Sequence, residues 1–379
     1  MSSKSEFGNL RTVLLGTAKG YAPYVWAWKA DCDQATFTEA TKLADKAIPP
    51  KILQEIEEDL ITFRNSLQSL DIEVLRPEYD LSERSWASDY FYATGCDPYN
   101  VRDLHAIIGK KMVFASPPCP SRVAENFQTR DYFVELAHKF NLEILEAPTP
   151  LLPNNPLVEV SQMDGVRSNE VAIGKKLGGV YKKVWHRLTE DELLFDAANI
   201  TRTDNSLLYL ISCTGNRRAA SWLEQKLRED YNFFATDVYR SSHIDSTIIP
   251  LSESKVLVNA SRVSRDSCIK GLENKELIFF DDVATIPREE LKFNDRRSRF
   301  AHAINKLGCH TNLSEMSSPW AGLNVLVIRE GLIAVESRQI ALISNLETHG
   351  FDVLPVVYRH PYTMLGGLHC STLDIVRGN

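Results

Sequence analysis

The sequence lacks the features that mark membrane-spanning, secreted and zinc-binding chains. No run approaches the ~20 consecutive apolar residues that a membrane-spanning helix needs. Residues 1–6 have neither the apolar core nor the small-residue cleavage site of a signal peptide. The seven cysteines are scattered and form no C-x-x-C pair, which argues against disulfides and a structural zinc site. We therefore expect a cytoplasmic protein with no membrane partner, no metal and no organic cofactor.

Positive charge is also scarce. The chain has 43 lysine and arginine residues against 50 aspartate and glutamate residues, a formal net charge of −7. Nucleic-acid-binding surfaces need clustered lysine and arginine, so this balance argues against a nucleic-acid partner. The apolar fraction of 44% is typical of a globular protein, and 379 residues suffice for two domains or one large repetitive domain.

A unit of strand, strand, helix and strand recurs along the chain. One clear copy has strands at 106–108 and 112–115, a helix at 130–140 and a strand at 142–145. About five copies can be traced, some of them incomplete, and such repetition indicates a radial or solenoid architecture. The copies run roughly over residues 10–80, 84–148, 195–240, 243–285 and 316–379, with insertions at 149–194 and 286–315.

Some stretches do not follow this pattern. The aromatic stretch 21–28 has neither helical nor strand periodicity, and packing is favoured over a lid as its role. Residues 266–272 are interpreted as a short helix. The basic run 296–299 predicts a solvent-exposed helix face. The last strand that the apolar pattern predicts covers residues 352–357.

One cysteine has an unusual setting. Two glycines before Cys370 allow a tight, otherwise strained turn, His369 precedes the thiol and two hydroxyl residues follow it. A lone cysteine is usually a small buried apolar residue. A role as nucleophile therefore depends on a base, an orienting acid and a substrate-binding site elsewhere in the chain.

Acidic residues and one histidine lie at the ends of elements in other copies. Asp103 follows an aromatic-rich loop, and Asp196 precedes two small residues; taken alone, these acids are explained by an ion pair and a helix N-cap. His243 and Asp245 are two residues apart. In an extended segment they would face one site, with Ile244 on the opposite side.

Taken together, these motifs resemble the arginine:glycine amidinotransferase family, and most closely the bacterial, especially cyanobacterial, amidinotransferases of guanidinium-toxin pathways such as those of saxitoxin and cylindrospermopsin. The resemblance implies the guanidino-group-modifying superfamily and its five-bladed α/β propeller of ββαβ modules with pseudo-fivefold symmetry. The matching segments are Arg102-Asp103, residues 195–198, residues 243–245, residues 258–262, residues 316–320 and residues 366–372.

The resemblance also implies a mechanism. Asp103, Asp196 and Asp245 would hold a planar guanidinium group by hydrogen bonds, and Asp196 would also orient His243. Cys370 would attack as a thiolate, favoured by the bound cation, and form an S-amidino-cysteine. His243 would protonate the departing amine and then deprotonate the incoming one.

Four further residues have roles by the same resemblance. Arg262 corresponds to the residue that holds the carboxylate of the amino-acid substrate, and Ser318 would line the Cys370 pocket. Arg240 and Ser242 belong to the segment that shapes the acceptor subsite, where the arginine:glycine enzymes have Asn-Pro-Met. The smaller Ser242 would leave room for an acceptor larger than glycine.

The sequence thus predicts an amidinotransferase with ping-pong kinetics, an L-arginine donor and a primary amine acceptor, acting in the biosynthesis of a guanidinium natural product such as saxitoxin. One alternative is an arginine or agmatine deiminase of the same fold, in which water takes the second step. A second alternative is a non-catalytic binding propeller. The resemblance is compatible with a homodimer, which the sequence itself does not show.

Overall fold

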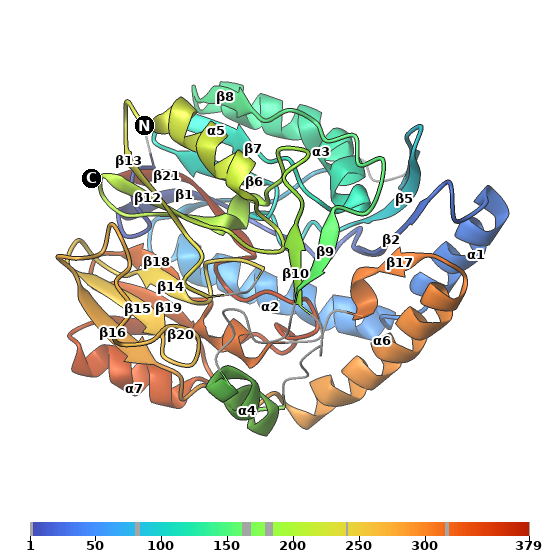
Figure 1. The fold of residues 1–379 in the computed structure, drawn as a ribbon. Coiled ribbons are helices and arrows are strands. Elements are labelled where there is room, and N and C mark those ends of the chain that lie inside the picture. The colour runs from blue at the N-terminus through green and yellow to red at the C-terminus, as the bar shows by residue number, and fades with distance from the viewer. Residues whose placement is uncertain are drawn as a thin grey trace.

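Sheets of three strands are the repeating unit of the fold (Figure 1). The computed structural model describes residues 3–79, 84–160, 168–178, 185–239, 242–314 and 318–378. In each sheet the middle strand pairs antiparallel with one neighbour and parallel with the other. The sheets of this kind are β21-β1-β3 (Thr372–Gly378, Asn9–Leu15, Glu73–Leu75), β6-β7-β8 (His105–Ile108, Lys111–Phe114, Glu143–Glu146), β11-β12-β13 (Ile200–Arg202, Ser206–Leu210, Asn232–Thr236), β14-β15-β16 (Ile248–Pro250, Lys255–Asn259, Glu276–Phe280) and β18-β19-β20 (Leu326–Arg329, Leu332–Glu336, Asp352–Val356).

Helices connect the two parallel strands in most of these sheets. They are α2 (Pro50–Gln68), α3 (Pro120–Lys139), α5 (Arg217–Leu227) and α7 (Ile340–Thr348). Helix α2 begins at the predicted proline, but α3 begins at Pro120 instead of residue 130, because a proline at the first helical position suits a helix start. Turns replace a helix between β15 and β16, so the prediction of a helix at 266–272 was wrong.

Buried side chains join each sheet to the next. In β15, Val256 and Val258 belong to a cluster with Leu208 of β12, whereas Leu257 belongs to a cluster with Val327 of β18. Alternate positions of one strand therefore face two neighbouring sheets, which explains why these strands are apolar throughout. Clusters of this kind lie between all successive sheets and close the ring. The architecture is the five-bladed α/β propeller that the resemblance implied.

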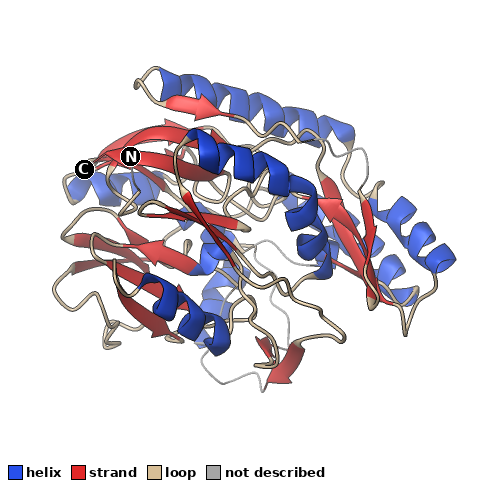
Figure 2. Ribbon diagram, turned by 90° about the horizontal axis from the view of Figure 1, so that it is seen from above, coloured by secondary structure: helices blue, strands red, loops and turns tan. Residues whose placement is uncertain are grey.

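The two ends of the chain meet in one sheet. Strand β21 pairs antiparallel with β1, and Leu14 lies opposite Leu373. The termini accordingly lie beside each other in both views (Figures 1 and 2). Strand β21 was not predicted from the apolar pattern, and its pairing with β1 places the last residues in the sheet of the first module. The proposed module and insertion boundaries stay a prediction.

An additional sheet and further elements lie outside the ring. The aromatic stretch 21–28 forms β2 (Ala22–Trp28) although its sequence has no strand periodicity, and its buried Val25 and Trp28 agree with the packing role that was favoured. Its sheet is completed by β5 (Phe91–Cys96), β4 (Ser85–Ala87) and β17 (His310–Thr311). The remaining elements are α1 (Gln34–Ala44), α4 (Ser168–Lys176), α6 (Arg288–Lys306), the hairpin β9-β10 (Leu157–Val160, Trp185–Leu188) and the short 3-10 helices η1 (Ala197–Asn199), η2 (Asn312–Ser314) and η3 (Pro319–Leu323).

Helix α6 contains the basic run 296–299. Arg297 is only 2% exposed, and it donates a hydrogen bond of 2.6 Å to the carbonyl oxygen of Thr363. Arg296 donates to the carbonyl oxygen of Ala47. The prediction of a purely solvent-exposed face was therefore wrong, because these guanidinium groups satisfy backbone carbonyls of neighbouring segments. Within the described ranges, no helix combines the length and apolar character that crossing a membrane requires.

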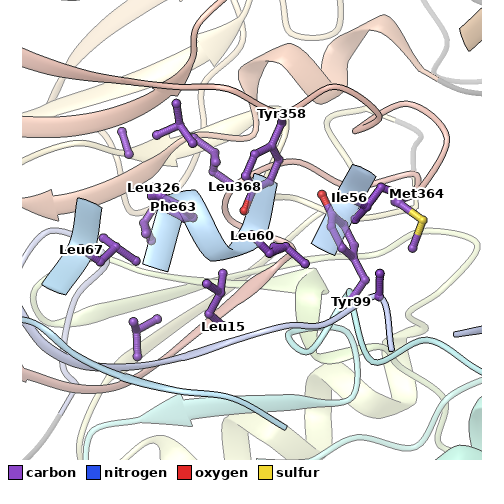
Figure 3. Close-up of a cluster of buried hydrophobic side chains, with 14 of the residues drawn as sticks. Leu15, Ile56, Leu60, Phe63, Leu67, Tyr99, Leu326, Tyr358, Met364 and Leu368 are labelled. Atoms are coloured by element: carbon purple, nitrogen blue, oxygen red, sulfur yellow. The ribbon is translucent and has the colours of Figure 1, made fainter. Parts of the chain in front are cut away.

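The apolar face of α2 packs against segments that flank Cys370 (Figure 3). Both Tyr358 and Leu368 are buried in this cluster, so the loop between β20 and β21 is anchored in the core at two points. The other labelled members of the cluster are Leu15, Ile56, Leu60, Phe63, Leu67, Tyr99, Leu326 and Met364.

Truncating the buried face of α2 should destabilise the fold. Leu60 is fully buried, so we expect Leu60→Ala to lower the free energy of unfolding by about 2–5 kcal/mol. The neighbouring Ile61 is 38% exposed, and Ile61→Ala should stay within about 0.5 kcal/mol of the wild type. Urea denaturation followed by circular dichroism measures both values. Equal losses in the two variants would contradict the packing described here.

Candidate active site

Cys370 lies in the buried loop between β20 and β21. Its backbone N–H donates a hydrogen bond of 2.9 Å to Oδ1 of Asn324, and its thiol donates to Oδ2 of Asp245 at 3.2 Å. The residue is 6% exposed. Two contacts from different blades therefore fix both the backbone and the sulfur of the candidate nucleophile.

The glycines before Cys370 allow close packing. A Cβ atom added to Gly366 would lie 2.1 Å from Oδ1 of Asn100 and 2.8 Å from Cβ of Cys370. The residue with a left-handed backbone in this loop is Leu365, with a φ of 58°. The predicted role of the glycines in a strained turn was therefore wrong. They are needed because other groups approach their backbone too closely for a side chain.

His243 lies between two carboxylates. Its Nε2 is 3.0 Å from Oδ2 of Asp196, and its Nδ1 is 3.7 Å from Oδ1 of Asp103. Burial alone would lower the pKa of His243, but the charges of these carboxylates and the hydrogen bond to Asp196 raise it to about 9. The imidazole is therefore protonated at neutral pH in this state of the site.

Each of these two carboxylates keeps one oxygen without a donor. Asp103 accepts a hydrogen bond from Arg122 through Oδ2, and burial raises the pKa of Asp103 while the Arg122 charge opposes that shift. Asp196 precedes η1 as its N-cap residue but makes no side-chain capping bond. Among the described residues, none donates a hydrogen bond to Oδ1 of Asp103 or Oδ1 of Asp196, although both atoms are buried. Buried acceptors without partners are rare and call for an explanation such as a ligand.

The third carboxylate contacts both the thiol and a second histidine. Oδ2 of Asp245 lies 2.9 Å from Nδ1 of His369. Burial opposes the ionisation of Asp245, but the hydrogen bond from His369 and the charges of His369 and His243 hold its pKa below the usual range. Burial and the negative charge of Asp245 in turn raise the pKa of the Cys370 thiol well above its usual value. The thiol is therefore protonated in the absence of a cationic ligand.

A buried ion-pair network supports the loop of Cys370, and the sequence analysis did not predict it. Nε of Arg102 donates to the carbonyl oxygens of His369, at 3.1 Å, and Thr372, at 2.9 Å. The same guanidinium contacts Asp374. Arg102 was visible beside Asp103 in the sequence, but no pattern indicates that it binds the backbone on either side of the thiol.

Arg202 occupies the centre of this network. Its guanidinium donates to Oε2 of Glu6 at 2.8 Å and also contacts Asp374. Burial opposes the ionisation of both acids, but Arg202 and its neighbours hold the pKa of Glu6 and that of Asp374 below the usual range. Nε2 of His369 lies 3.4 Å from Oε2 of Glu6, so the network extends to the residue beside Cys370.

The segment 243–247 is a turn, so the prediction of an extended strand there was wrong. Ile244 is nevertheless buried in the core, and the side chains of His243 and Asp245 still reach the site. The backbone N–H of Thr247 donates to the carbonyl oxygen of Ile244 and closes the turn. The carbonyl oxygen of Ser242 accepts a hydrogen bond from Ser212, and Ser242 itself is exposed. Arg240 lies outside the described residues.

Arg262 contacts Ser246 and Thr247 at the C-terminal end of this turn. Its Nη1 donates to Oγ1 of Thr247 at 2.8 Å, and its Nη2 lies 3.5 Å from Oγ of Ser318. Its Nε donates to Oε1 of Glu170 at 2.9 Å, a contact that the sequence analysis did not predict. The described contacts of the Ser318 side chain are with Arg262 and the backbone of Trp320 and do not include Cys370. Within the described part of the chain, no group of three or more acids, histidines and cysteines is arranged so that it could hold a metal ion.

Amidinotransferases are similar to this chain over nearly its whole length. Inosamine-phosphate amidinotransferase 1 of Streptomyces glaucescens is 29% identical, covering 100% of this chain and 97% of the relative. A Streptomyces griseus protein provisionally named inosamine-phosphate amidinotransferase 2 is 31% identical, covering 87% of this chain and 82% of the relative. L-arginine:L-lysine amidinotransferase of Pseudomonas savastanoi pv. phaseolicola is 23% identical, covering 99% and 94%. No family model matches the chain.

Solved structures agree with these sequence relations. The inosamine-phosphate amidinotransferase of Streptomyces griseus superposes with a TM-score of 0.76 at 28% identity, covering 100% of this chain and 97% of that one. An amidinotransferase of the saxitoxin biosynthetic pathway from Microseira wollei gives a TM-score of 0.73 at 22% identity, covering 99% of this chain and 97% of that one. This second likeness shows a shared fold. On the evidence of a 31% identical relative aligned over most of both sequences, this chain belongs to the amidinotransferase family and is an amidinotransferase enzyme.

Proposed function

We propose that this enzyme transfers the amidino group of L-arginine to a primary amine through a covalent intermediate on Cys370, releasing ornithine. The observation that carries the proposal is a pair of buried carboxylate oxygens, on Asp103 and Asp196, to which no residue in the described ranges donates a hydrogen bond. A guanidinium group is planar, cationic and rich in N–H donors, so it would satisfy both oxygens at once. A relative that is named for an L-arginine donor supports the choice of arginine.

The electrostatics of the site favour attack only when the donor is bound. Burial and the Asp245 carboxylate keep the Cys370 thiol protonated in this state, because its pKa is raised. A guanidinium held by Asp103, Asp196 and Asp245 would place a positive charge beside the sulfur and lower that pKa. The thiol would then release its proton to solvent and become a thiolate.

The reaction proceeds in two balanced steps. In the first, the Cys370 sulfur bonds to the guanidinium carbon, and the bond from that carbon to Nε of the arginine breaks. His243 gives its proton to this nitrogen, which becomes the side-chain amino group of the departing ornithine. His243 is in the required charged form before the donor binds, because the neighbouring carboxylates raise its pKa to about 9 in the free site. In the second step, His243 takes a proton from the acceptor amine, whose nitrogen bonds to the amidino carbon while the carbon–sulfur bond breaks.

The acceptor is proposed to be a primary amine larger than glycine, in the biosynthesis of a guanidinium natural product such as saxitoxin. Named acceptors differ among the relatives and include inosamine phosphates and lysine, so membership of the family does not select one. Ser242 supports a larger acceptor, because it is small and exposed beside His243. Arg240 is proposed to contribute to the same acceptor subsite, and Arg262 with Ser318 to bind a substrate carboxylate.

The products from arginine test the transfer reaction. With arginine and hydroxylamine or a panel of amines, we expect ornithine release that depends on the amine, and with arginine alone a single turnover that adds one amidino group to Cys370. Mass spectrometry of the intact protein and amino-acid analysis measure these products. Cys370→Ala should abolish both signals, whereas Cys268→Ala, at an exposed free cysteine, should preserve them. Citrulline as the main product would identify a deiminase instead, and turnover by Cys370→Ala would refute the covalent mechanism.

Removing the Asp245 charge should make the free thiol more reactive. The negative charge of Asp245 contributes to the raised pKa of Cys370, so Asp245→Asn should lower that pKa. Each unit of pKa lost increases the thiolate fraction about tenfold while the thiol is mostly protonated. We therefore expect faster alkylation of Cys370 by iodoacetamide at about pH 8, together with loss of arginine turnover. Asp266→Asn, at an exposed position, is the matched control. Slower alkylation in Asp245→Asn would contradict the electrostatic account.

A further inference from the structure

Helix α4 brings a buried acid to the arginine that is proposed to bind a substrate carboxylate. Glu170 of α4 is 1% exposed, and its Oε1 accepts a hydrogen bond of 2.9 Å from Nε of Arg262. Ile173, one turn after Glu170 in α4, and Leu177, directly after the helix, pack against the core beside β18 and β19. The carbonyl oxygen of Leu177 also accepts a hydrogen bond from Ile286. Glu170 is therefore held at Arg262 by the packing of α4.

The contact leaves defined positions open on both partners. Nη1 of Arg262 donates to Thr247 and Ser246, and Nε donates to Glu170. Among the described residues, the hydrogen bond of Nη2 is the long one of 3.5 Å to Ser318. The hydrogen bond from Arg262 reaches Oε1 of Glu170 and leaves the second carboxylate oxygen, Oε2, out of that contact. The pair can therefore accept one carboxylate at Nη2 and one cation at Oε2 without breaking its own ion pair.

Charge neutrality indicates which ligand suits this pair. Arg262 and Glu170 together carry no net charge, so a carboxylate alone would leave the buried site with an excess negative charge. An α-amino acid carries a carboxylate and an ammonium group on the same carbon, and it would add no net charge. An Arg–Glu pair thus complements a zwitterion better than a carboxylate or an amine alone.

We infer that Glu170 binds the α-ammonium group of the amino-acid donor and so selects a zwitterionic substrate at the end of the site remote from Cys370. Residues 245–247 connect the two ends, because Asp245 contacts the Cys370 sulfur and Thr247 contacts Arg262. The inference rests on the proposed arginine donor and adds a second recognition element to it.

Three donors test the inference in the first half-reaction, which needs no acceptor. Arginine carries both α-substituents, 5-guanidinovaleric acid lacks the amino group and agmatine lacks the carboxylate. Single-turnover formation of the Cys370 adduct is followed by mass spectrometry across a range of donor concentrations. For the wild type we expect the second-order rate constant to be about tenfold or more greater for arginine than for either analogue, because each analogue leaves a buried charge unpaired.

The variant Glu170→Gln tests whether Glu170 binds the ammonium group of the substrate or only supports Arg262. Its amide oxygen can still accept the Nε hydrogen of Arg262, but the negative charge is lost. We expect the rate constant for arginine to fall about tenfold or more, while that for 5-guanidinovaleric acid stays within about twofold or rises. Glu159→Gln makes the same chemical change at an exposed position of β9 and should change neither value. Thermal unfolding of both variants checks that each is folded.

Each remaining outcome overturns the inference. Equal losses for arginine and 5-guanidinovaleric acid in folded Glu170→Gln would mean that Glu170 only supports Arg262. A rate constant for arginine that rises would mean that Glu170 competes with the substrate carboxylate. A wild type that does not prefer arginine over 5-guanidinovaleric acid would refute the inference without any variant. If no donor forms an adduct on Cys370, the proposed function itself fails, and that result is distinct from adducts formed without discrimination.

Discussion

A buried ion-pair network joins both ends of the chain to β11 and so constrains how the blades assemble. Arg202 of β11 binds Glu6 near the N-terminus and Asp374 in the last strand. Removing a charged group from water costs several kcal/mol, so these groups are stable inside only as a paired set. The set therefore requires the chain ends and a distant blade to meet. Arg102 extends this constraint to the carbonyl groups on either side of Cys370.

The site next to this network differs from it, because its acidic groups leave an excess of negative charge. Asp103 and Asp196 each keep a buried oxygen to which no described residue donates a hydrogen bond. The neighbouring carboxylates raise the pKa of His243 against the effect of burial, whereas burial and Asp245 both raise the pKa of Cys370. Such a site is stable only because the surrounding ring fixes its side chains. A cationic planar ligand would relieve the excess charge and activate the sulfur in the same event. The ion-pair network thus stabilises the fold, and the site next to it is proposed to bind the substrate.

Much of this could be predicted from the sequence, because the signals are local. Apolar periodicity predicted α2 from Pro50, and the hairpin at 106–115 followed from two apolar runs around a turn. Motif resemblance named Cys370, His243 and three aspartates before any contact was known, and the structure brings these five side chains together. Their roles stay a proposal. Where local periodicity was absent, as in the strand Ala22–Trp28, the sequence predicted no element, because pairing with β5 decided the structure.

The class of elements, the repeat and the reactive residue types can be predicted from the sequence, since each depends on residues close together in the chain. The distant groups that complete the site follow from the three-dimensional arrangement alone. Glu6 is 363 positions from His369, and Asn324 holds the backbone of Cys370 from another blade. Glu170 meets Arg262 from an insertion that has no repeat pattern. These partners are fixed by ring closure and by the need to neutralise buried charge, and neither leaves a periodic signal in the sequence.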